Sequence, residues 1–172
     1  SSGETTPNIT ANVAGSYTVT VTNANNCTAT AATTLTINPN PIPNITAPIS
    51  FCSGDVISID ADAGYTQYIW STGATTQTIN TPFSGNYAVT VTNSNGCTGN
   101  AQVSVAETIL SPSITGPTSI CGGSSATLSA TPGYTTYHWA AGESTASINA
   151  TTDDTYAVTV TDANGCTGSA SF

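Results

Sequence analysis

The sequence predicts an all-β protein made of tandem, small antiparallel β-sandwiches, and three observations lead to this fold class. Apolar and small polar residues alternate in three similar stretches, which begin at Tyr17, Tyr87 and Tyr156. Such alternation is typical of a half-buried strand. Each stretch ends in an Asn- or Asp-led tetrad followed by a cysteine, and Asn-Gly in this place favours a hairpin. Turn residues also recur about every 8 to 12 residues, as in sandwiches of short strands.

The chain repeats itself with a period of 69 residues. This spacing separates four pairs of residues: Cys97 and Cys166, Cys52 and Cys121, Trp70 and Trp139, and Pro48 and Pro117. The first copy is offset by 70 residues from the second. We therefore predict three domains, namely the C-terminal half of a truncated repeat at 1–38, a full repeat at 39–107 and a repeat with a truncated last strand at 108–172. The sequence is expected to be a window from a longer array.

Residues 1–43 are expected to contain one hairpin and one connector. Residues 17–22 form the first strand of the hairpin, and residues 33–37 form its partner. Residues 38–43 read NPNPIP, and alternate prolines favour an extended, stiff segment. Because proline has no N–H to donate to a sheet, we expect this segment to connect two units.

A full unit is expected to contain six or seven short strands and no helix. In the second unit the strands lie near residues 45–49, 56–61, 66–70 and 77–80, and the Tyr87 hairpin closes the unit. Glycines mark the turns between them. The regular alternation favours packed strands over disorder, although Thr, Ser, Asn and Ala fill much of the chain.

Alternation also assigns the two faces of the strands. Ile57, Ile59 and Ala61 are expected to face the core, because side chains of a strand point to opposite faces in turn. Tyr68 and Trp70 share one face of their strand. The other face carries Ile69, which the third unit replaces with His138. The aromatic residues predicted to anchor the cores are Trp70, Trp139, Tyr17, Tyr87 and Tyr156.

The five cysteines predict one disulfide in each full repeat. Cys52 and Cys97 lie 45 residues apart, and so do Cys121 and Cys166. A unit of this size buries little apolar area, and closing such a loop would stabilise it by roughly 4 kcal/mol. The position 45 residues before Cys27 precedes Ser1, so Cys27 is expected to be unpaired within these residues. Zinc binding is the alternative, but the sequence has no CxxC motif and one histidine.

Disulfides and charge together predict the location and the partners. Disulfides persist in oxidising compartments, so we expect an extracellular or cell-surface protein. The chain has no Lys or Arg and a formal net charge of −9, which argues against nucleic acid and anionic membranes as partners. No apolar run reaches the roughly 18 residues that span a bilayer, so no membrane insertion is expected. The expected partners are neighbouring repeats or chains of the same protein, with surface glycans as a second candidate.

The combined pattern of the repeat resembles a known family. It consists of WSTGATT at 70–76, GNYAVTVT at 85–92 and NGC at 95–97. This pattern is similar to the Ig-like and PKD-like repeats of large secreted proteins of Bacteroidota, and the resemblance covers essentially the whole chain. It implies Ig-like sandwiches, export that is often by the type IX system, and tandem arrangement in adhesins, where the repeats are spacers or adhesive stalks. The Gly-Asp-Gly that follows the tryptophan in PKD repeats is missing here.

The sequence predicts no catalytic residue, no cofactor and no metal site. His138 is the only histidine, so no Ser-His-Asp or Cys-His pair can be built. Asp60 and Asp62 could offer oxygen ligands to calcium, and so could Asp153 and Asp154. Neither pair recurs in the sister unit, so solvated turn residues are the favoured interpretation.

Three functions remain open at this point. We expect a non-catalytic extracellular structural or adhesive segment that forms a stalk or fibre. The first alternative is a subunit of a self-assembling extracellular filament, whose open strand edges a neighbouring chain completes. The second is a carbohydrate-binding module of a secreted enzyme, in which Tyr65 and Tyr134 stack on sugar rings or the outward threonines Thr18, Thr20 and Thr22 contact the sugar.

Overall fold

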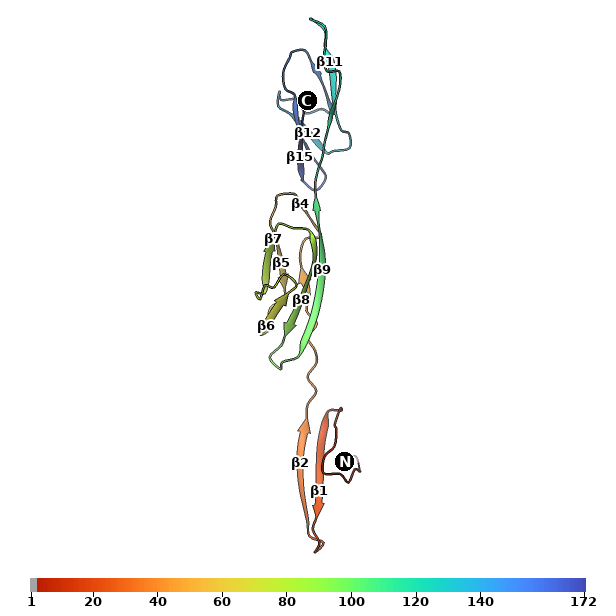
Figure 1. Cartoon of the computed structure of the whole chain (residues 1–172), viewed down its shortest axis with the longest axis vertical. Coiled ribbons are helices and arrows are strands. Elements are labelled where there is room, and N and C mark those ends of the chain that lie inside the picture. The colour runs from red at the N-terminus through yellow and green to blue at the C-terminus, as the bar shows by residue number, and fades with distance from the viewer. Residues whose placement is uncertain (1–2) are drawn as a thin grey trace.

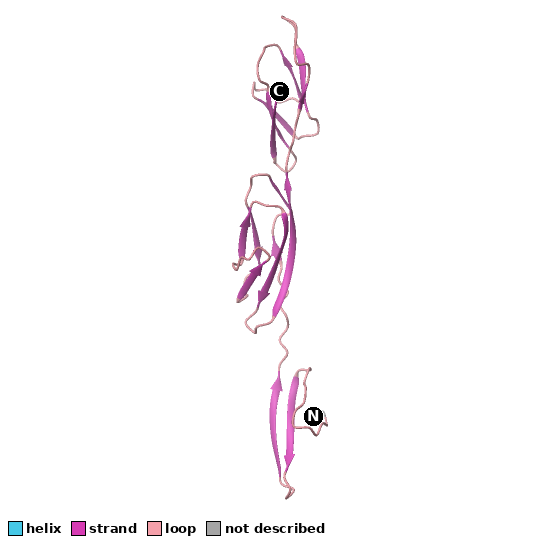
Figure 2. Ribbon diagram, viewed as in Figure 1, coloured by secondary structure: helices cyan, strands magenta, loops and turns pink. Residues whose placement is uncertain are grey.

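The computed structural model describes residues 3–172, which form fifteen strands and no helix. The strands group into three units that follow one another along one long axis, with unit 1 N-terminal, unit 2 central and unit 3 C-terminal (Figures 1 and 2). The predicted all-β class is confirmed. No helix within residues 3–172 is long and apolar enough to cross a membrane. Residues 1 and 2, with which the predicted first domain begins, lie outside the described residues.

Unit 1 is a single hairpin of two strands. β1 (Gly15–Thr22) pairs antiparallel with β2 (Thr28–Leu35), and the last pair is Thr22 opposite Thr28. The prediction that the second strand covers residues 33–37 was therefore wrong. Residues 28–32 are only Thr and Ala, so they gave no apolar alternation, yet their backbone pairs with β1.

Unit 2 is a β-sandwich of two sheets. Its strands are β3 (Ile45–Thr46), β4 (Ser50–Cys52), β5 (Ile57–Ala61), β6 (Gln67–Trp70), β7 (Thr78–Thr81), β8 (Gly85–Thr92) and β9 (Thr98–Thr108). One sheet has the order β3-β5-β7 and the other has the order β4-β9-β8-β6. All neighbours are antiparallel except β4, which runs parallel to the C-terminal end of β9. The short β4 is therefore fixed at the end of unit 2 that faces unit 3 (Figure 1).

Unit 3 repeats this arrangement without a counterpart of β4. Its strands are β10 (Ile114–Thr115), β11 (Ala126–Ala130), β12 (Thr136–Trp139), β13 (Ser147–Ala150), β14 (Ala157–Thr161) and β15 (Thr167–Ser171). They form the sheets β10-β11-β13 and β12-β14-β15. β15 has five residues and β9 has eleven, and residues 119–121 form no strand in the described chain.

Each sandwich encloses its own core. In unit 2, Ile59, Ala61 and Trp70 are at most 2% exposed, whereas Ile69 on the opposite face is 48% exposed. In unit 3, Trp139 is fully buried and His138, next to it in β12, is exposed. The indole N–H of each tryptophan donates to a carbonyl six residues later at 2.8 Å, that of Thr76 or of Thr145. Both tryptophans are thus held by packing and by one hydrogen bond.

The three tyrosines that begin the repeated hairpins differ in burial. Each donates its hydroxyl to the carbonyl four residues earlier, at 2.8 Å for Tyr17 and Tyr87 and at 3.0 Å for Tyr156. Tyr87 is buried, whereas Tyr17 and Tyr156 are half-buried. Within residues 3–172, unit 1 consists of the sheet β1-β2 alone, and Val19, on the same face of β1 as Tyr17, is 56% exposed. The hydrogen bond from the tyrosine hydroxyl therefore recurs in all three units, whereas the burial of the tyrosine depends on packing against a second sheet.

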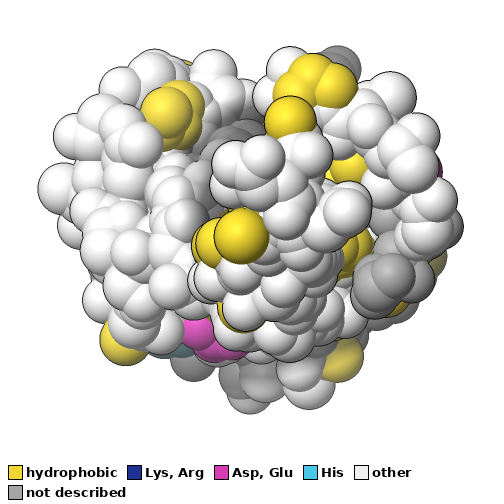
Figure 3. Space-filling model, turned by 90° about the horizontal axis from the view of Figure 1, so that it is seen from below, with side chains coloured by type: hydrophobic (Ala, Val, Ile, Leu, Met, Phe, Trp, Pro, Cys, Tyr) yellow, Lys and Arg dark blue, Asp and Glu magenta, His cyan; other side chains and the backbone are white. Residues whose placement is uncertain are grey.

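The surface is polar and lacks basic residues. Viewed end-on from below, hydrophobic side chains form separate patches among small polar ones (Figure 3). The sequence contains nine acidic side chains, one histidine and no Lys or Arg. Contacts between a unit and its connector therefore involve no Lys or Arg; in one of them the side-chain amide of Asn93 donates to the Pro39 carbonyl at 3.3 Å.

Candidate functional site

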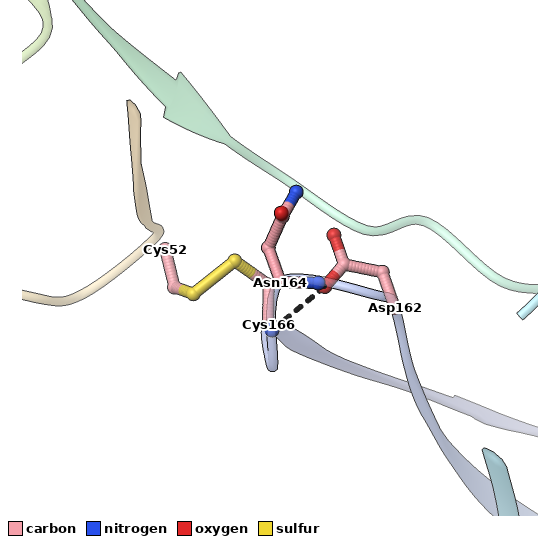
Figure 4. The surroundings of a disulfide bond; sticks show 4 residues. All are labelled: Cys52, Asp162, Asn164 and Cys166. Atoms are coloured by element: carbon pink, nitrogen blue, oxygen red, sulfur yellow. Dashed lines mark hydrogen bonds between the residues drawn. A yellow bond between two sulfur atoms is a disulfide. The ribbon is translucent and has the colours of Figure 1, made fainter. Parts of the chain in front are cut away.

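A disulfide joins unit 2 to unit 3 (Figure 4). Cys52 and Cys166 are bonded, with Cα atoms 5.1 Å apart and a separation of 114 positions in sequence. The predicted pairs Cys52–Cys97 and Cys121–Cys166 are therefore wrong. Within residues 3–172, Cys97, Cys121 and Cys27 are free thiols. We call the Cys52–Cys166 bond the junction disulfide.

The strand directions explain why Cys52 does not bond to Cys97. Cys97 lies directly before the first residue of β9, whereas Cys52 lies beside Thr108 at the last residue of β9. Eleven residues of strand span roughly 35 Å at about 3.3 Å per residue. Disulfide-bonded Cα atoms usually lie within about 7 Å of each other. The two cysteines of unit 2 thus occupy its opposite ends.

Cys166 is held by the turn between β14 and β15. Asp162 Oδ1 accepts the N–H groups of Asn164 and Cys166, each at 2.9 Å. The N–H of Asp162 in turn donates to the Cys166 carbonyl at 3.0 Å. Gly165 has a φ of +87°, a left-handed conformation that glycine adopts without steric cost. The closed turn places Cys166 against Cys52, where its side chain is 3% exposed (Figure 4).

The same turn recurs in the other two units. Asn93 Oδ1 accepts the N–H of Cys97 at 3.0 Å, and Asn23 Oδ1 accepts that of Cys27 at 3.0 Å. Side chains of Asn and Asp commonly close turns in this way. The sequence pattern indicated a hairpin here, but it did not show that the tetrad also sets the position of the cysteine. Cys27, Cys97 and Cys166 therefore occupy one equivalent place.

Cys52 is held from the side of unit 2. The N–H of Ser53 donates to the Thr108 carbonyl at 3.0 Å, which fixes the end of β4 beside the end of β9. The N–H of Asp55 donates to the Cys52 carbonyl at 3.0 Å and closes a turn after the cysteine. Phe51, in the same short strand, is buried in the core of unit 2. Cys52 is thus attached to a packed strand rather than to a loose loop.

The connectors between units lie against the hairpins at a glycine. A methyl group at Gly168 would lie 2.6 Å from Leu110 Cβ and 2.8 Å from the Leu110 carbonyl oxygen. At the preceding junction, a methyl group at Gly99 would lie 1.9 Å from the carbonyl oxygen of Pro41. All three distances are far shorter than van der Waals contact. Glycine is therefore required for the connector to pack where it does.

Replacing Gly168 by alanine is expected to destabilise unit 3 by about 1–3 kcal/mol, the usual cost of overpacking. The added methyl group displaces the Leu110 backbone from β15, since the contact at 2.8 Å cannot be relieved by rotating a side chain. Urea unfolding followed by circular dichroism measures the change. Gly122→Ala is the matched control, because a methyl group there meets no atom within 4 Å. If the two substitutions lowered stability equally, the conclusion that the connector requires glycine at position 168 would be wrong.

The acidic residues considered for calcium make hydrogen bonds within the units. Asp60 accepts from the Gln77 amide at 3.0 Å and from the Thr78 hydroxyl, and Asp62 accepts the N–H of Asn44 at 3.2 Å. Asp154 accepts the N–H of Thr155 at 2.7 Å. In the described part of the chain, no three His, Cys, Asp or Glu side chains come together in a metal-binding group.

The tyrosines considered for sugar stacking pack against other tyrosines. Tyr65 lies edge-on to Tyr68 with ring centroids 5.9 Å apart, and Tyr134 lies edge-on to Tyr137 at 6.3 Å. Both outer rings are half-buried. The three outward threonines of β1 are exposed, in a hairpin that no second sheet covers.

Unit 3 has a groove of about 700 Å³ between residues 117–123 and residues 150–156. Its lining includes Ile120, Cys121, Leu128, Ala150, Tyr156 and Phe172. In unit 2 the corresponding region is filled by β4 and the last residues of β9, where Phe51 is 7% exposed and Val105 is 4% exposed.

Comparisons with known proteins were made for the whole chain. No protein-family model and no curated protein matches the sequence. Among solved structures, the chain is similar to fibronectin(III)-like modules of Clostridium thermocellum CbhA, at 15% identity over 74% of this chain and 92% of that chain, with a TM-score of 0.34. It is also similar to murine CEACAM1b, at 11% identity over 74% and 97% of the two chains, with a TM-score of 0.36.

A third similar structure is SGBP-B of a mixed-linkage glucan utilization locus of Bacteroides ovatus, solved in complex with a mixed-linkage heptasaccharide. The identity is 14% over 90% of this chain and 48% of that chain, with a TM-score of 0.25. Similarities at this level say nothing about function. The assignment of β-sandwich units rests on the strand pairing described above.

Proposed function

We propose that this chain is a non-catalytic, extracellular structural segment, in which β-sandwich repeats form a stiff stalk or fibre of a large bacterial surface protein. The junction disulfide is the observation that carries the proposal. A bond within one repeat would stabilise that repeat alone, whereas the Cys52–Cys166 bond fixes one repeat to the next.

Three restraints act together at this junction. β9 leads directly into the connector to unit 3, so the backbone is the first link (Figure 1). The connector packs on Gly168, which is the second link. The disulfide is the third and joins the hairpin turn of unit 3 to β4 of unit 2. Two units joined at separate points cannot bend or twist freely, whereas most domains in one chain move relative to each other.

Composition and resemblance support the extracellular part of the proposal. Disulfides persist in oxidising compartments. The sequence pattern around Trp70 and Tyr87 resembles repeats of secreted Bacteroidota adhesins that are exported by the type IX system. On this proposal the partners of the chain are neighbouring repeats of the same protein, and binding to surface glycans would be an additional property of the stalk.

Electron microscopy of the purified, oxidised chain tests the proposal. Units 2 and 3 are expected to appear as a straight rod with a narrow distribution of angles between them. The same material treated with a reductant is the control and should show a wider distribution. Equally wide distributions before and after reduction would contradict a stiff stalk.

A filament subunit is the second candidate function. An open strand site allows a neighbouring chain to add a strand. Contacts between chains that bury well over about 1,000 Å² would favour the filament over an isolated stalk. A carbohydrate-binding module would instead require binding on a glycan array that Tyr65→Ala abolishes.

A further inference from the structure

We propose that the junction disulfide forms by rearrangement of an earlier, non-native disulfide, and that this chain is therefore a substrate of a thiol–disulfide isomerase. The inference depends on Cys97 and Cys121, which lie between Cys52 and Cys166 in the sequence. Both are thiols while the chain is unfolded, whatever each one bonds to afterwards. The inference goes beyond the proposed function, because it concerns how the junction is made and not what the joined units do.

The junction disulfide closes the longest loop that these four cysteines allow. It spans 114 positions, whereas the other five pairs span 24, 45 or 69 positions. The probability that a flexible loop closes falls with about the three-halves power of its length, so a loop of 45 positions closes about four times as often as one of 114. Encounters in the unfolded chain therefore favour the non-native bonds.

The order of the chain also brings Cys97 to Cys52 before the fold separates them. Cys97 directly precedes β9, and β4, which ends in Cys52, is fixed by pairing with residues 106–108 at the end of that strand. Since chains are made from the N-terminus, the Cys97 thiol is present before the residues that hold Cys52 away from it. Cys166 follows Cys97 by a further 69 positions. The Cys52–Cys97 bond therefore has the earlier opportunity to form.

A Cys52–Cys97 bond cannot remain in the folded protein. The eleven residues of β9 separate the two cysteines by roughly 35 Å at about 3.3 Å per residue, whereas bonded Cα atoms usually lie within about 7 Å of each other. The bond would keep β4 from its place beside β9 and would keep Phe51 out of the core, where it is 7% exposed. Completion of unit 2 therefore requires that this bond be broken.

The junction disulfide is protected once it has formed. Thiol–disulfide exchange requires that a thiolate reach one of the two sulfur atoms. Cys166 is 3% exposed, and its N–H is held by Asp162 Oδ1 at 2.9 Å. Cys97 is half-buried at the other end of unit 2, with Sγ 3.7 Å from the Asn38 carbonyl oxygen. Rearrangement therefore ends at the Cys52–Cys166 bond.

The rearrangement itself consumes no oxidant. An isomerase thiolate attacks Cys52 Sγ in the Cys52–Cys97 bond, and Cys97 leaves as a thiolate that takes up a proton. The Cys166 thiolate then attacks Cys52 Sγ in the mixed disulfide, and the isomerase leaves as a thiolate. One S–S bond is broken and one is formed within the chain. A small-molecule disulfide such as glutathione disulfide is sufficient to supply the first bond.

The experiment is oxidative refolding of the dilute, reduced and denatured 172-residue chain in a glutathione buffer, with and without protein disulfide isomerase. Every sample carries Cys27→Ser, so that only the four cysteines from 52 to 166 compete. Samples are alkylated at intervals, and mass spectrometry identifies their bonds. Early samples should contain the Cys52–Cys97 bond. The isomerase should speed the appearance of Cys52–Cys166 by at least about tenfold, since reshuffling takes seconds to hours depending on the oxidant and the isomerase.

The matched variant carries Cys97→Ser and Cys121→Ser and keeps both cysteines of the junction. Its Cys52–Cys166 bond should form without isomerase, and added isomerase should leave the rate nearly unchanged. Isomerase with alkylated active-site cysteines is the control and should not accelerate either chain. If Cys52–Cys166 were the first bond in the chain with four cysteines, or if the isomerase accelerated both chains equally, the inference would be wrong. Either result would leave the proposed stalk standing, because stiffness depends on the finished bond. Flexible rods whose bond needs the isomerase would do the reverse.

Discussion

Replacing Trp139 by alanine is expected to unfold unit 3 and leave unit 2 folded. Trp139 is fully buried, and removing a buried tryptophan costs about 3–5 kcal/mol. A unit of this size has a small core, so that loss is comparable to the whole stability of many small domains. The substitution also leaves the Thr145 carbonyl without the indole N–H that donates to it at 2.8 Å.

Hydrogen exchange of β11 and β14 amides measures this outcome, because these strands belong to unit 3 alone. In the variant, Trp70 is the only tryptophan that remains, so its fluorescence follows the unfolding of unit 2. His138→Ala is the matched control, since it changes the exposed neighbour in the same strand and should shift stability by no more than about 0.5 kcal/mol. If the β11 amides of the Trp139→Ala variant remained protected from exchange, the prediction that unit 3 depends on the core around Trp139 would be wrong.

The sandwich fold followed from the sequence because its pattern depends on local geometry. Alternation in β5 and β8 assigned the buried faces, and the structure buries Ile57, Ile59 and Ala61 as expected. The strand β2 was partly missed for the opposite reason. Its first five residues are only Thr and Ala, which show no contrast between an inner and an outer face. Such a strand is defined by backbone hydrogen bonds, which cannot be predicted from the types of its side chains.

The cysteine positions followed from the sequence, but the pairing did not. A separation of 45 residues and one of 114 both fit a repeat of 69, so spacing alone cannot distinguish a bond within a repeat from a bond between repeats. Whether Cys52 can bond within its own repeat or to the next one depends on the position of β4. This strand pairs in parallel with the C-terminal end of β9. That contact joins residues more than fifty positions apart, and three residues of strand carry no periodic signal.

The alternating pattern also did not predict how deeply the tyrosine that begins each repeated hairpin is buried. Tyr17 and Tyr87 begin nearly identical stretches and make the same bond to the carbonyl four residues earlier. Within residues 3–172, Tyr87 lies in a core shared by two sheets, whereas Tyr17 lies in the two-stranded sheet β1-β2 alone. The similar local sequences led us to predict both tyrosines as core residues. Packing between sheets determines how far each one is buried.

Pulling the oxidised chain by its two ends is expected to leave about 40 nm of contour length unreleased, at about 3.5 Å per residue. The junction disulfide encloses a loop of 114 residues, which includes nearly all of units 2 and 3. Force that enters at Cys52 passes through the sulfur atoms to Cys166 and bypasses the loop. The two sandwiches are thereby protected from extension even after their strands separate. Single-molecule force spectroscopy measures the released length directly.

Cys166→Ser should restore the missing length, while Cys97→Ser should not, because Cys97 forms no disulfide in the described chain. The same substitution is expected to lower the unfolding free energy of the chain by up to about 5 kcal/mol, since opening a loop of this length returns entropy to the unfolded state. That loss should appear in both units, although neither core is altered, whereas the Trp139→Ala loss is confined to unit 3. Full extension of the oxidised wild-type chain would falsify the bond between Cys52 and Cys166 and, with it, the covalent junction on which a stiff stalk depends.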